Sequence, residues 1–470
     1  MSEKGRTVSV GSRILIGERA IKSGSGNESG ERLKNAAEFA TGTGVLHDNM
    51  KTPSLNNVTG QPEKLRTVCA DIAKASFTWA SEDRQEGIQP QTNHAVREWL
   101  RAQLEETRRL GYTGLQIVCE STAGYHKRLL RIARAEGCTT ALVSAEQVKA
   151  MQVVESNDTG KSDWKDPRTM LLLVQLGKTL TDRQLHGEWA ALRELNVDYE
   201  HVERRGTQVK NRIHGILLQL FPDLSFKKDW LFTAAAARAV LAVYGFNPYA
   251  IVAAGEAPLR RTLRKQGVRE KTSGRIFRDA LQSVLQPSDA LWREIKTEQL
   301  RDAYADLSAA QQRREKIRAQ MIALLEALQG KGEVKLQPQK GLIGAFLLAR
   351  ILGETGPLGD FKSVSQLLRY AGMNLRPNQS GEHRGPERQA KRGRARLRAV
   401  LAQAVLKLVV RTELYGPYFH AKKAAGMPGA VAMTAVARKF LKLLFGLNHS
   451  AHAFDPARVF KCHNEYAKAA

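Results

Sequence analysis

The first strongly apolar segments of the chain are short and predict β-strands. Residues 65–72 and 75–80 are apolar and β-branched, and together they predict a hairpin. Residues 115–120 are a continuous apolar run, which suits a strand covered on both faces, and residues 139–143 predict a further buried strand. Helical patterns separate and follow these runs. The predicted order is hairpin, helix, strand, helix, strand, helix.

Past residue 180 the apolar positions recur with helical spacing. One stripe runs through residues 189–216 and another through residues 300–328. Long amphipathic helices need a partner, and two interpretations remain open: the stripes pack on each other within one chain, or they form a coiled-coil-like arm that also joins protomers. Residues 225–290, with prolines at or near the boundaries, predict a compact helical insert. Its Arg260–Lys265 run either contacts nucleic acid or faces water.

Charge is distributed unevenly along the chain. Lysine and arginine number 73 against 47 acidic residues, a net charge of +26. Residues 341–450 hold 18 of these cations and only 5 acids, which is half of the whole excess. Such a basic region predicts a polyanionic partner, because lysine and arginine release counterions from a phosphate backbone. A solvated basic face is the alternative, while membrane-surface binding is disfavoured because no helix pairs a basic face with an aromatic apolar one.

Composition limits the remaining classes of protein. A chain of 470 residues with 42% hydrophobic content is expected to form two to four domains. Its most apolar stretches, residues 231–246 and 342–352, are too short to span a bilayer, and the start lacks a secretory apolar core, so we expect no membrane partner and a cytoplasmic location. The four cysteines show no paired or zinc-type spacing and are expected to be reduced and buried. Residues 1 to about 60 are rich in Gly, Ser, Asn and Thr and predict disorder.

Four carboxylates fall at positions suited to metal-dependent chemistry. Asp71 lies near the turn of the predicted hairpin and Glu120 ends the next strand, at the strand ends where α/β sheets place their sites. Asp163 and Asp166 are three residues apart, which puts them on one face of a helix. Attack on a phosphodiester needs divalent cations, and clustered oxygen ligands hold such hard cations. The placement predicts a Mg²⁺ site for nucleic-acid phosphoryl transfer in a ribonuclease H-like fold.

A second interpretation exists for Asp166. Proline disfavours helical dihedrals in the residue before it and suits the first helical position, so Pro167 makes Asp166 a candidate helix cap. Capping and metal binding are compatible, because a carboxylate has two oxygens. Glu155 and Asp158 are nearby rivals for the ligand role.

Ser380 is a candidate nucleophile in the basic region. It lies between Pro377-Asn378 and Gly381, a turn composition that predicts an exposed hydroxyl on a loop. A serine hydroxyl becomes reactive only beside a base or metal and donors that stabilise developing charge. A turn hydrogen bond is the ordinary alternative. The basic residues around it, candidates for nucleic-acid binding, are Arg376, Arg384, Arg388, Lys391, Arg392, Arg394, Arg396 and Arg398.

Motifs around these residues resemble the DEDD transposases of the insertion-sequence 110 family. The first part of the likeness is Asp71-Ile-Ala-Lys-Ala, then Glu120-Ser-Thr-Ala-Gly-Tyr, then Lys161-Ser-Asp-x-x-Asp166. The second is Phe361 to Met373, then Gln379-Ser380-Gly381 and a basic run that leads into a helix. The likeness covers roughly residues 65–178 and 336–448.

The resemblance implies a fold, a mechanism and partners. The fold class is α/β plus all-α, with a RuvC-like (ribonuclease H-like) domain, a coiled-coil-like helical middle with an insert, and a mainly helical C-terminal transposase domain. Ser380 is implied to attack the scissile phosphate and form a phosphoserine link, while Asp71, Glu120, Asp163 and Asp166 hold Mg²⁺. A structured non-coding guide RNA is implied to pair with donor and target double-stranded DNA. The serine and the acids are expected from different protomers of a homo-tetramer.

The expected domains follow from the same comparison. They are a disordered extension at 1–62, a RuvC-like domain at 63–178, a helical region at 179–332 with its insert at 225–290, a transposase domain at 333–450, and a tail at 451–470.

Departures from the family pattern leave all four acids and the serine in place. Ala123 replaces a usual glycine, Ser144-Ala145 a common Asn-Pro, and Pro167 a usual alanine. Gly341–Gly344 stands where relatives often have a helix-hairpin-helix-like segment that starts with proline.

Alternative functions predict different products. A metal-dependent Holliday-junction nuclease would cut with water and leave no protein-linked strand. A non-catalytic RNA-binding protein with a decayed site is disfavoured, because all four acids are present. A tyrosine recombinase is less favoured, because the Arg/His constellation which that chemistry requires is not evident around Tyr370, Tyr415 or Tyr418.

Overall fold

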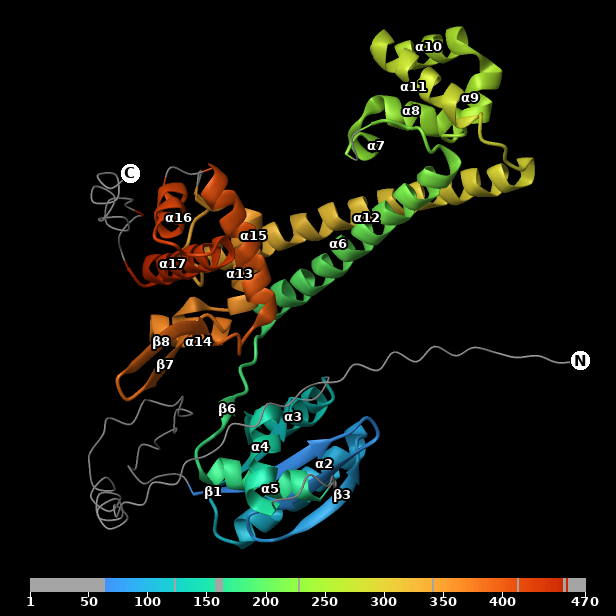
Figure 1. The fold of residues 1–470 in the computed structure, drawn as a ribbon. Helices are drawn as coiled ribbons and strands as arrows, with labels where there is room; N and C mark the ends of the chain where they lie inside the picture. Colours follow the sequence, from blue (N-terminus) through green and yellow to red (C-terminus); the bar gives the residue numbers. More distant parts are fainter. Residues whose placement is uncertain are drawn as a thin grey trace, which may run out of the picture. The chain divides into compact units, whose positions relative to one another are not determined.

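The computed structural model describes residues 64–121, 124–156, 164–226, 229–339, 342–411, 414–450 and 454. The chain divides into two compact units, Met1–Arg183 and Gln184–Ala470, each of which is described by itself (Figure 1). The predicted disordered extension, Asp158, Asp163, Cys462 and nearly all of the predicted tail lie outside the described residues.

A six-stranded sheet forms the first unit, in the order β3-β2-β1-β4-β5-β6. Its strands are β1 (Leu65–Ile72), β2 (Ser76–Ser81), β3 (Glu86–Pro90), β4 (Gly114–Glu120), β5 (Thr139–Val143) and β6 (Leu180–Thr181). β1 pairs antiparallel with β2 and parallel with β4, and β4 pairs parallel with β5. The predicted hairpin and the two predicted buried strands are therefore confirmed. β3 and β6 were not predicted.

Helices cover both faces of this sheet. Alternate residues of β1 and β4, such as Ala70 and Cys119, belong to a core shared with α2 (Asn93–Arg109) and α3 (His126–Ala135). The residues between them, such as Cys69 and Val118, pack with α4 (Ala145–Ser156) and α5 (Lys165–Gln175) on the opposite face. Because side chains alternate along a strand, burial on both faces requires the continuous apolar runs seen in the sequence.

Three of the four cysteines lie in the described residues, and all three are buried and free. Burial raises the pKa of the Cys138 thiol to about 11 and raises the pKa of Cys69 as well. The expectation of reduced, buried thiols is confirmed for these three, and they are poor nucleophiles.

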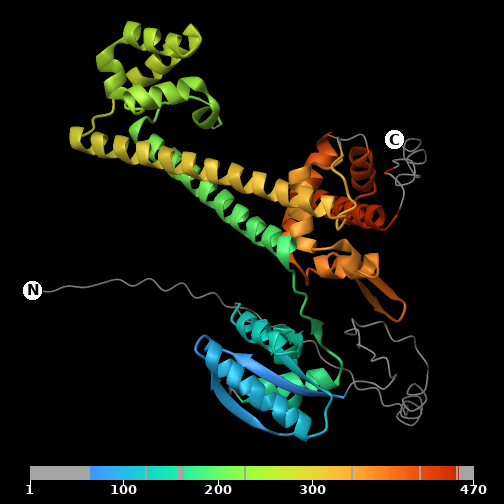
Figure 2. The same ribbon diagram turned by 180° about the vertical axis from the view of Figure 1, so that it is seen from behind.

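Two long helices, α6 (Gly187–Leu220) and α12 (Ala290–Gly330), lie side by side in the second unit and form a helical arm (Figures 1 and 2). At one end Leu192 packs in a core with Met321, and at the other Ile213 packs with Leu300. The two predicted stripes therefore pack on each other within one chain. Whether the arm also joins protomers stays a prediction.

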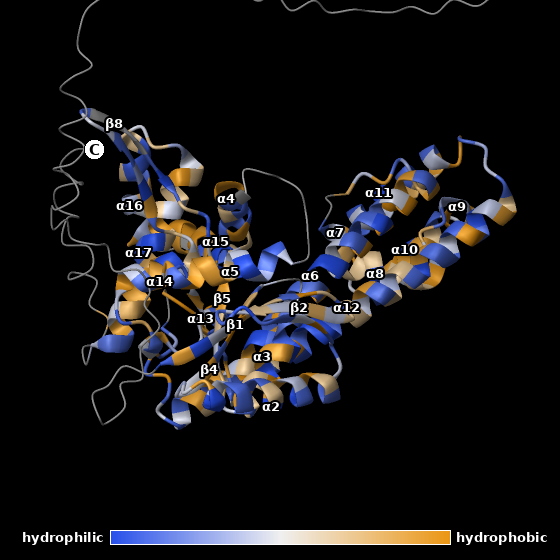
Figure 3. Ribbon diagram, turned by 90° about the horizontal axis from the view of Figure 1, so that it is seen from below, coloured by the Kyte–Doolittle hydropathy of each residue, from blue (hydrophilic) through white to orange (hydrophobic). Residues whose placement is uncertain are grey.

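Five short helices form the insert between α6 and α12. They are α7 (Trp230–Thr233), α8 (Ala235–Tyr244), α9 (Pro248–Ala254), α10 (Glu256–Lys265) and α11 (Glu270–Ser283). Their buried side chains share one core with α6 and α12. Among the described residues no single helix has the length and apolar composition to cross a membrane, and α8 and α9 reach them only as a pair bent by 83°. Figure 3 shows hydrophilic and hydrophobic residues interleaved on α10 and α11, as in amphipathic helices.

The C-terminal part packs against the other end of the helical arm. Its elements are α13 (Ala345–Thr355), η1 (Leu358–Asp360), α14 (Val364–Ala371), β7 (Leu375–Ser380), β8 (His383–Gln389), α15 (Ala395–Arg411), α16 (Tyr415–Ala424) and α17 (Gly429–His449). Buried residues of α13, α15 and α17 share a core with α6 and α12. The predicted fold class, mixed α/β followed by a mainly helical part, is confirmed. The β7–β8 hairpin was not predicted.

Candidate active site

Asp71 and Glu120 occupy neighbouring positions at one edge of the sheet. β1 and β4 are parallel, and their register pairs Ala70 with Cys119, so Asp71 and Glu120 are the next residues on each strand. By alternation Asp71 lies on the same face as Cys69, which is the face covered by α4 and α5. Glu120 lies on that face for the same reason. Two half-buried carboxylates therefore meet at the carboxyl ends of adjacent parallel strands.

Asp166 lies on the helix that covers this face. It is the second residue of α5, whose N-cap is Trp164, and the structure has no side-chain cap hydrogen bond there. The cap interpretation of Asp166 is therefore wrong: the helix begins earlier, and Pro167 fits in its first turn, where no backbone N–H donor is needed. The Gln152 amide on α4 donates a hydrogen bond to the Asp166 carboxylate.

Of the remaining metal-ligand candidates, only Glu155 lies within the described residues. Asp163 and Asp158 lie outside the described residues. Glu155 accepts a hydrogen bond of 2.8 Å from the Thr169 hydroxyl and so links α4 to α5. Within the described residues, no three His, Cys, Asp or Glu side chains are close enough together to hold a metal ion. The donors that are described, carboxylate oxygens at adjacent strand ends, are of the kind Mg²⁺ prefers.

The Cys119 thiol, one residue before Glu120, is buried on the face covered by α2 and α3. Burial raises the pKa of the Cys119 thiol far above its usual value, and the carboxylates of Asp182, Glu120 and Asp71 raise it further. The Arg134 guanidinium, which pairs with Asp182, acts in the opposite direction.

Ser380 is the last residue of β7, at the tip of an exposed hairpin. It is exposed and pairs with His383 across the two-residue loop Gly381-Glu382. Gly381 has a φ of 57°, the left-handed conformation that such a short hairpin loop needs at its first position. The predicted exposure of Ser380 is confirmed, although the residue ends a strand instead of lying on a free loop.

Proline explains an irregularity within the hairpin. Arg376 pairs with Arg388 but Asn378 pairs with Gly385, so the register shifts at Pro377. Proline has no N–H to donate to a partner strand and is tolerated in a two-stranded sheet at such a bulge. Gly and Pro residues argue against strands in the sequence, but here they fit the bulge and the turn of the hairpin.

The base of the hairpin is held tightly against α14. The backbone N–H of Arg394 donates to the carbonyl oxygen of Tyr370 over 2.8 Å, and that of Lys391 donates to Gly372 over 3.1 Å. A Cβ on Gly393 would lie 2.6 Å from the Tyr370 carbonyl oxygen, so only glycine fits there. The segment after β8 is therefore fixed at a backbone crossing.

The eight candidate nucleic-acid-binding residues fall into two groups. Arg376, Arg388, Lys391 and Arg392 are exposed, and the backbone of Arg384 pairs with Gln379 in the hairpin. The other three are half-buried, and each has a defined partner within the protein. Arg394 pairs with Glu354, Arg396 lies 3.3 Å from Glu200, and Arg398 donates to the carbonyl oxygen of Ala371 over 3.0 Å.

A buried polar network joins the hairpin base to the helical arm. Glu354 on α13 is fully buried; its carboxylate accepts a hydrogen bond of 2.7 Å from Asn196 on α6 and pairs with Arg394. Arg350, also buried, donates to Asn196 over 2.8 Å. Buried charges must be paired, so this cluster fixes the relative positions of α6, α13 and the start of α15. The only signal in the sequence is the occurrence of Arg and Glu within an apolar helix.

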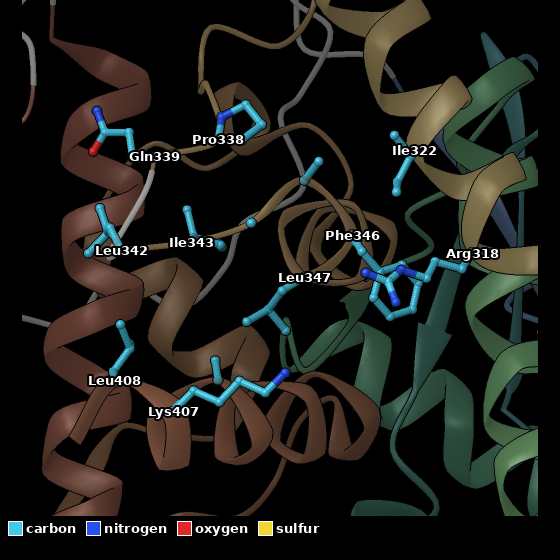
Figure 4. A pocket seen from close by; sticks show the side chains of 13 residues that line it. Arg318, Ile322, Pro338, Gln339, Leu342, Ile343, Phe346, Leu347, Lys407 and Leu408 are labelled. Carbon is cyan, nitrogen blue, oxygen red and sulfur yellow. The ribbon is translucent and has the colours of Figure 1, made fainter. Parts of the chain in front are cut away.

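A cavity of about 490 Å³ lies between α12, α13 and α15 (Figure 4). The Arg318 guanidinium lies over the ring of Phe346, 5.3 Å from its centre, and Lys407 lines the cavity from α15. Leu342 and Ile343, from the predicted helix-hairpin-helix-like segment, are buried in its wall. Among the residues that the structure describes, no acidic side chain and no residue of β7 or β8 lines this cavity, so it is separate from Ser380.

Comparison with known protein families gives two matches. A family model for DEDD transposases of the IS110 type matches residues 68–222, which contain all four candidate acids. A second model, described as the transposase IS116/IS110/IS902 family, matches residues 340–420, which contain Ser380. No curated protein matches the chain.

Proposed function

Because the chain belongs to the IS110 family of transposases, we propose that it recombines DNA through a covalent phosphoserine intermediate formed by Ser380. Transposases of this kind move a mobile element and act on DNA. The finer proposal adds Mg²⁺ held by Asp71, Glu120, Asp163 and Asp166, and a guide RNA. It also adds assembly as a tetramer in which the acids and the serine come from different protomers.

The observation that carries the proposal is the placement of Asp71 and Glu120 at adjacent strand ends, on the face that is covered by α5, the helix on which Asp166 lies. Acids at the carboxyl ends of adjacent parallel strands are typical of α/β active sites. Mg²⁺ bound there would neutralise charge on a phosphodiester and on the departing oxygen.

Ser380 supports the second half of the proposal through its exposure and surroundings. Its Oγ forms a bond to the scissile phosphorus while the bond from phosphorus to one strand oxygen breaks, and the serine proton passes to that oxygen. Attack by a hydroxyl from another DNA end reverses the step and restores the serine. One phosphoester is exchanged for another in each step, so no nucleotide cofactor is consumed. Arg376 and Arg388, exposed on the paired strands, can hold the phosphates beside it.

Guidance by RNA is proposed from the family resemblance and from charge. The basic C-terminal region can hold the backbones of both RNA and DNA without reading their sequences. Sequencing the nucleic acid that copurifies with the protein tests this point. An RNA encoded beside the gene for this chain supports guidance, and recovery of only unrelated cellular RNA contradicts it.

The nucleophile is tested by a denaturing gel after incubation of the protein with its copurified RNA, element-end DNA and Mg²⁺. We expect wild type and Ser365→Ala to give a protein-linked strand and Ser380→Ala to give none. Ser365 is a suitable control because it is exposed on α14 in the same part of the chain. Adducts in Ser380→Ala would show the assignment to be wrong. Cut DNA without adducts in wild type would favour the hydrolytic nuclease.

A further inference from the structure

The outer surface of α10 and α11 is strongly basic and is not used by the chemistry above. Residues 225–290 contain 11 lysines and arginines against 5 acids. Six of these cations are exposed around the two helices, and within the described residues none of the six forms an ion pair: Arg261, Arg264, Lys265, Arg269, Lys271 and Arg278. Arg260 differs, because Glu256 and Glu270 neutralise it.

A short turn fixes the two helices relative to each other. α10 ends at Lys265 and α11 begins at Glu270, with Gly267 in the left-handed region at a φ of 70°. The N–H of Val268 donates to the carbonyl oxygen of Leu263 over 3.1 Å, which closes the end of α10. Two helices joined by a tight turn of this kind, with a glycine in it, form the unit that many DNA-binding proteins use.

The inner faces of the pair are packed, so the outer faces are presented rigidly. Leu259 and Leu263 on α10, and Ile276 and Ala280 on α11, are fully buried in one core. A substitution on the outer face therefore changes charge without disturbing this packing.

The outer face of α11 carries side chains that suit nucleic acid. Lys271, Arg275, Arg278 and Gln282 are exposed and follow one another at intervals of four, three and four residues, so they form one stripe along the helix. Arg275 also donates to Ser225, which holds it near the middle of the stripe. Lysine, arginine and glutamine are the residues that contact phosphates and the major-groove edges of bases.

We propose that α10 and α11 form a second binding surface for duplex DNA, with α11 in the major groove. The major groove of B-form DNA admits an α-helix, whereas the deep, narrow groove of A-form RNA does not. Charge complementarity and the exposed helix thus favour DNA over structured RNA. The proposal rests on DNA being the substrate and is independent of the role of Ser380.

Binding of the full chain to a short random-sequence DNA duplex, and to an RNA duplex of the same sequence, tests the proposal. The measurement is made without divalent metal, so that no strand is cut and a failure of the serine mechanism cannot affect it. We expect Lys271→Glu/Arg278→Glu to weaken DNA binding about tenfold. Lys271→Gln/Arg278→Gln should lower the slope of log K against log salt by about two.

The matched control is Arg108→Glu/Lys316→Glu, which makes the same charge change at exposed positions on α2 and α12. It should bind DNA within about twofold of wild type. DNA affinity and salt slope equal to those of the control would overturn the proposal. An equal loss on the RNA duplex would overturn the major-groove assignment and make the surface a general phosphate contact. Thermal unfolding of each variant checks that it is folded. If the two Glu substitutions lower the stability, the DNA affinity and salt slope of Lys271→Gln/Arg278→Gln decide the test.

Discussion

The candidate acids and the candidate serine are built on opposite kinds of scaffold. Asp71 and Glu120 lie at the carboxyl ends of strands that are paired on both sides and covered on both faces. Ser380 is at the exposed end of a sheet with only two strands, and such a hairpin is marginally stable alone. The acids are therefore positioned by a hydrophobic core, whereas the serine is positioned by the hydrogen bonds and ion pair at the base of its hairpin. Contacts remote from Ser380 should therefore affect the position of the serine more than remote contacts affect the positions of the acids.

The largest expected effect is at the sheet edge. Asp71→Asn keeps the shape of the side chain and removes its charge, so DNA cleavage should fall about a thousandfold or more. The free energy of unfolding should change little. Glu86→Gln is the control, because Glu86 is on the outer strand β3 and pairs with Arg168. If Asp71→Asn cleaves DNA at the rate of the control, the carboxylate at this edge of the sheet does not take part in cleavage.

Loss of the buried carboxylate should destabilise the second unit. Glu354→Ala leaves Arg394 and Asn196 without their partner, and the free energy of unfolding should fall by about 3 kcal/mol. Urea denaturation measures it, with Glu315→Ala as the control at an exposed ion pair with Arg314. The control should lose no more than about 1 kcal/mol. Equal losses would show that the buried network does not hold the hairpin base.

A methyl group added at Gly393, where the chain crosses the end of α14, should reduce adduct formation by Ser380 more than it reduces overall stability. Gly393→Ala forces a Cβ against the Tyr370 carbonyl, and we expect a loss of about 2 kcal/mol together with weaker adduct formation. Gly332→Ala is the control, since Gly332 also has a positive φ of 73° but open space around it. If the two variants give equal adduct yields, the substitution at Gly393 strains the backbone without displacing the hairpin, and the prediction is wrong.

The smallest effect concerns phosphate contacts on the hairpin. Arg376→Ala/Arg388→Ala should weaken DNA binding several-fold and lower the salt slope by about two. The double control Arg205→Ala/Arg313→Ala removes the same charge from surface ion pairs on the arm. Fluorescence anisotropy at several salt concentrations makes the comparison. An unchanged slope in the hairpin variant would place the DNA elsewhere.

The sequence predicted what depends on local apolar patterns. β1, β2, β4 and β5 are recognisable because they are buried, and the stripes of α6 and α12 because each packs on the other. β3 and the β7–β8 hairpin escaped prediction because their exposed Gly, Pro and polar residues carry no alternation. The apolar spacing also could not show that Glu354 meets Asn196, because 158 residues separate them in the chain.

For the candidate site, the sequence predicted where each residue lies in its local element but not its tertiary contacts. The strand ends of Asp71 and Glu120 follow from the sequence, because a strand boundary is a local property. The division among the basic residues does not, since the pairing of Arg394, Arg396 and Arg398 with distant groups depends on the tertiary fold. The role of Asp163 stays a prediction.

The most direct test of the serine mechanism is mass spectrometry of the trapped protein–DNA adduct after protease and nuclease digestion. A nucleotide phosphate attached to the peptide that contains Ser380 is the expected result. A nucleotide attached to Tyr415, Tyr418 or another residue, or cut DNA with no modified peptide, would contradict the proposal that this hairpin carries the nucleophile.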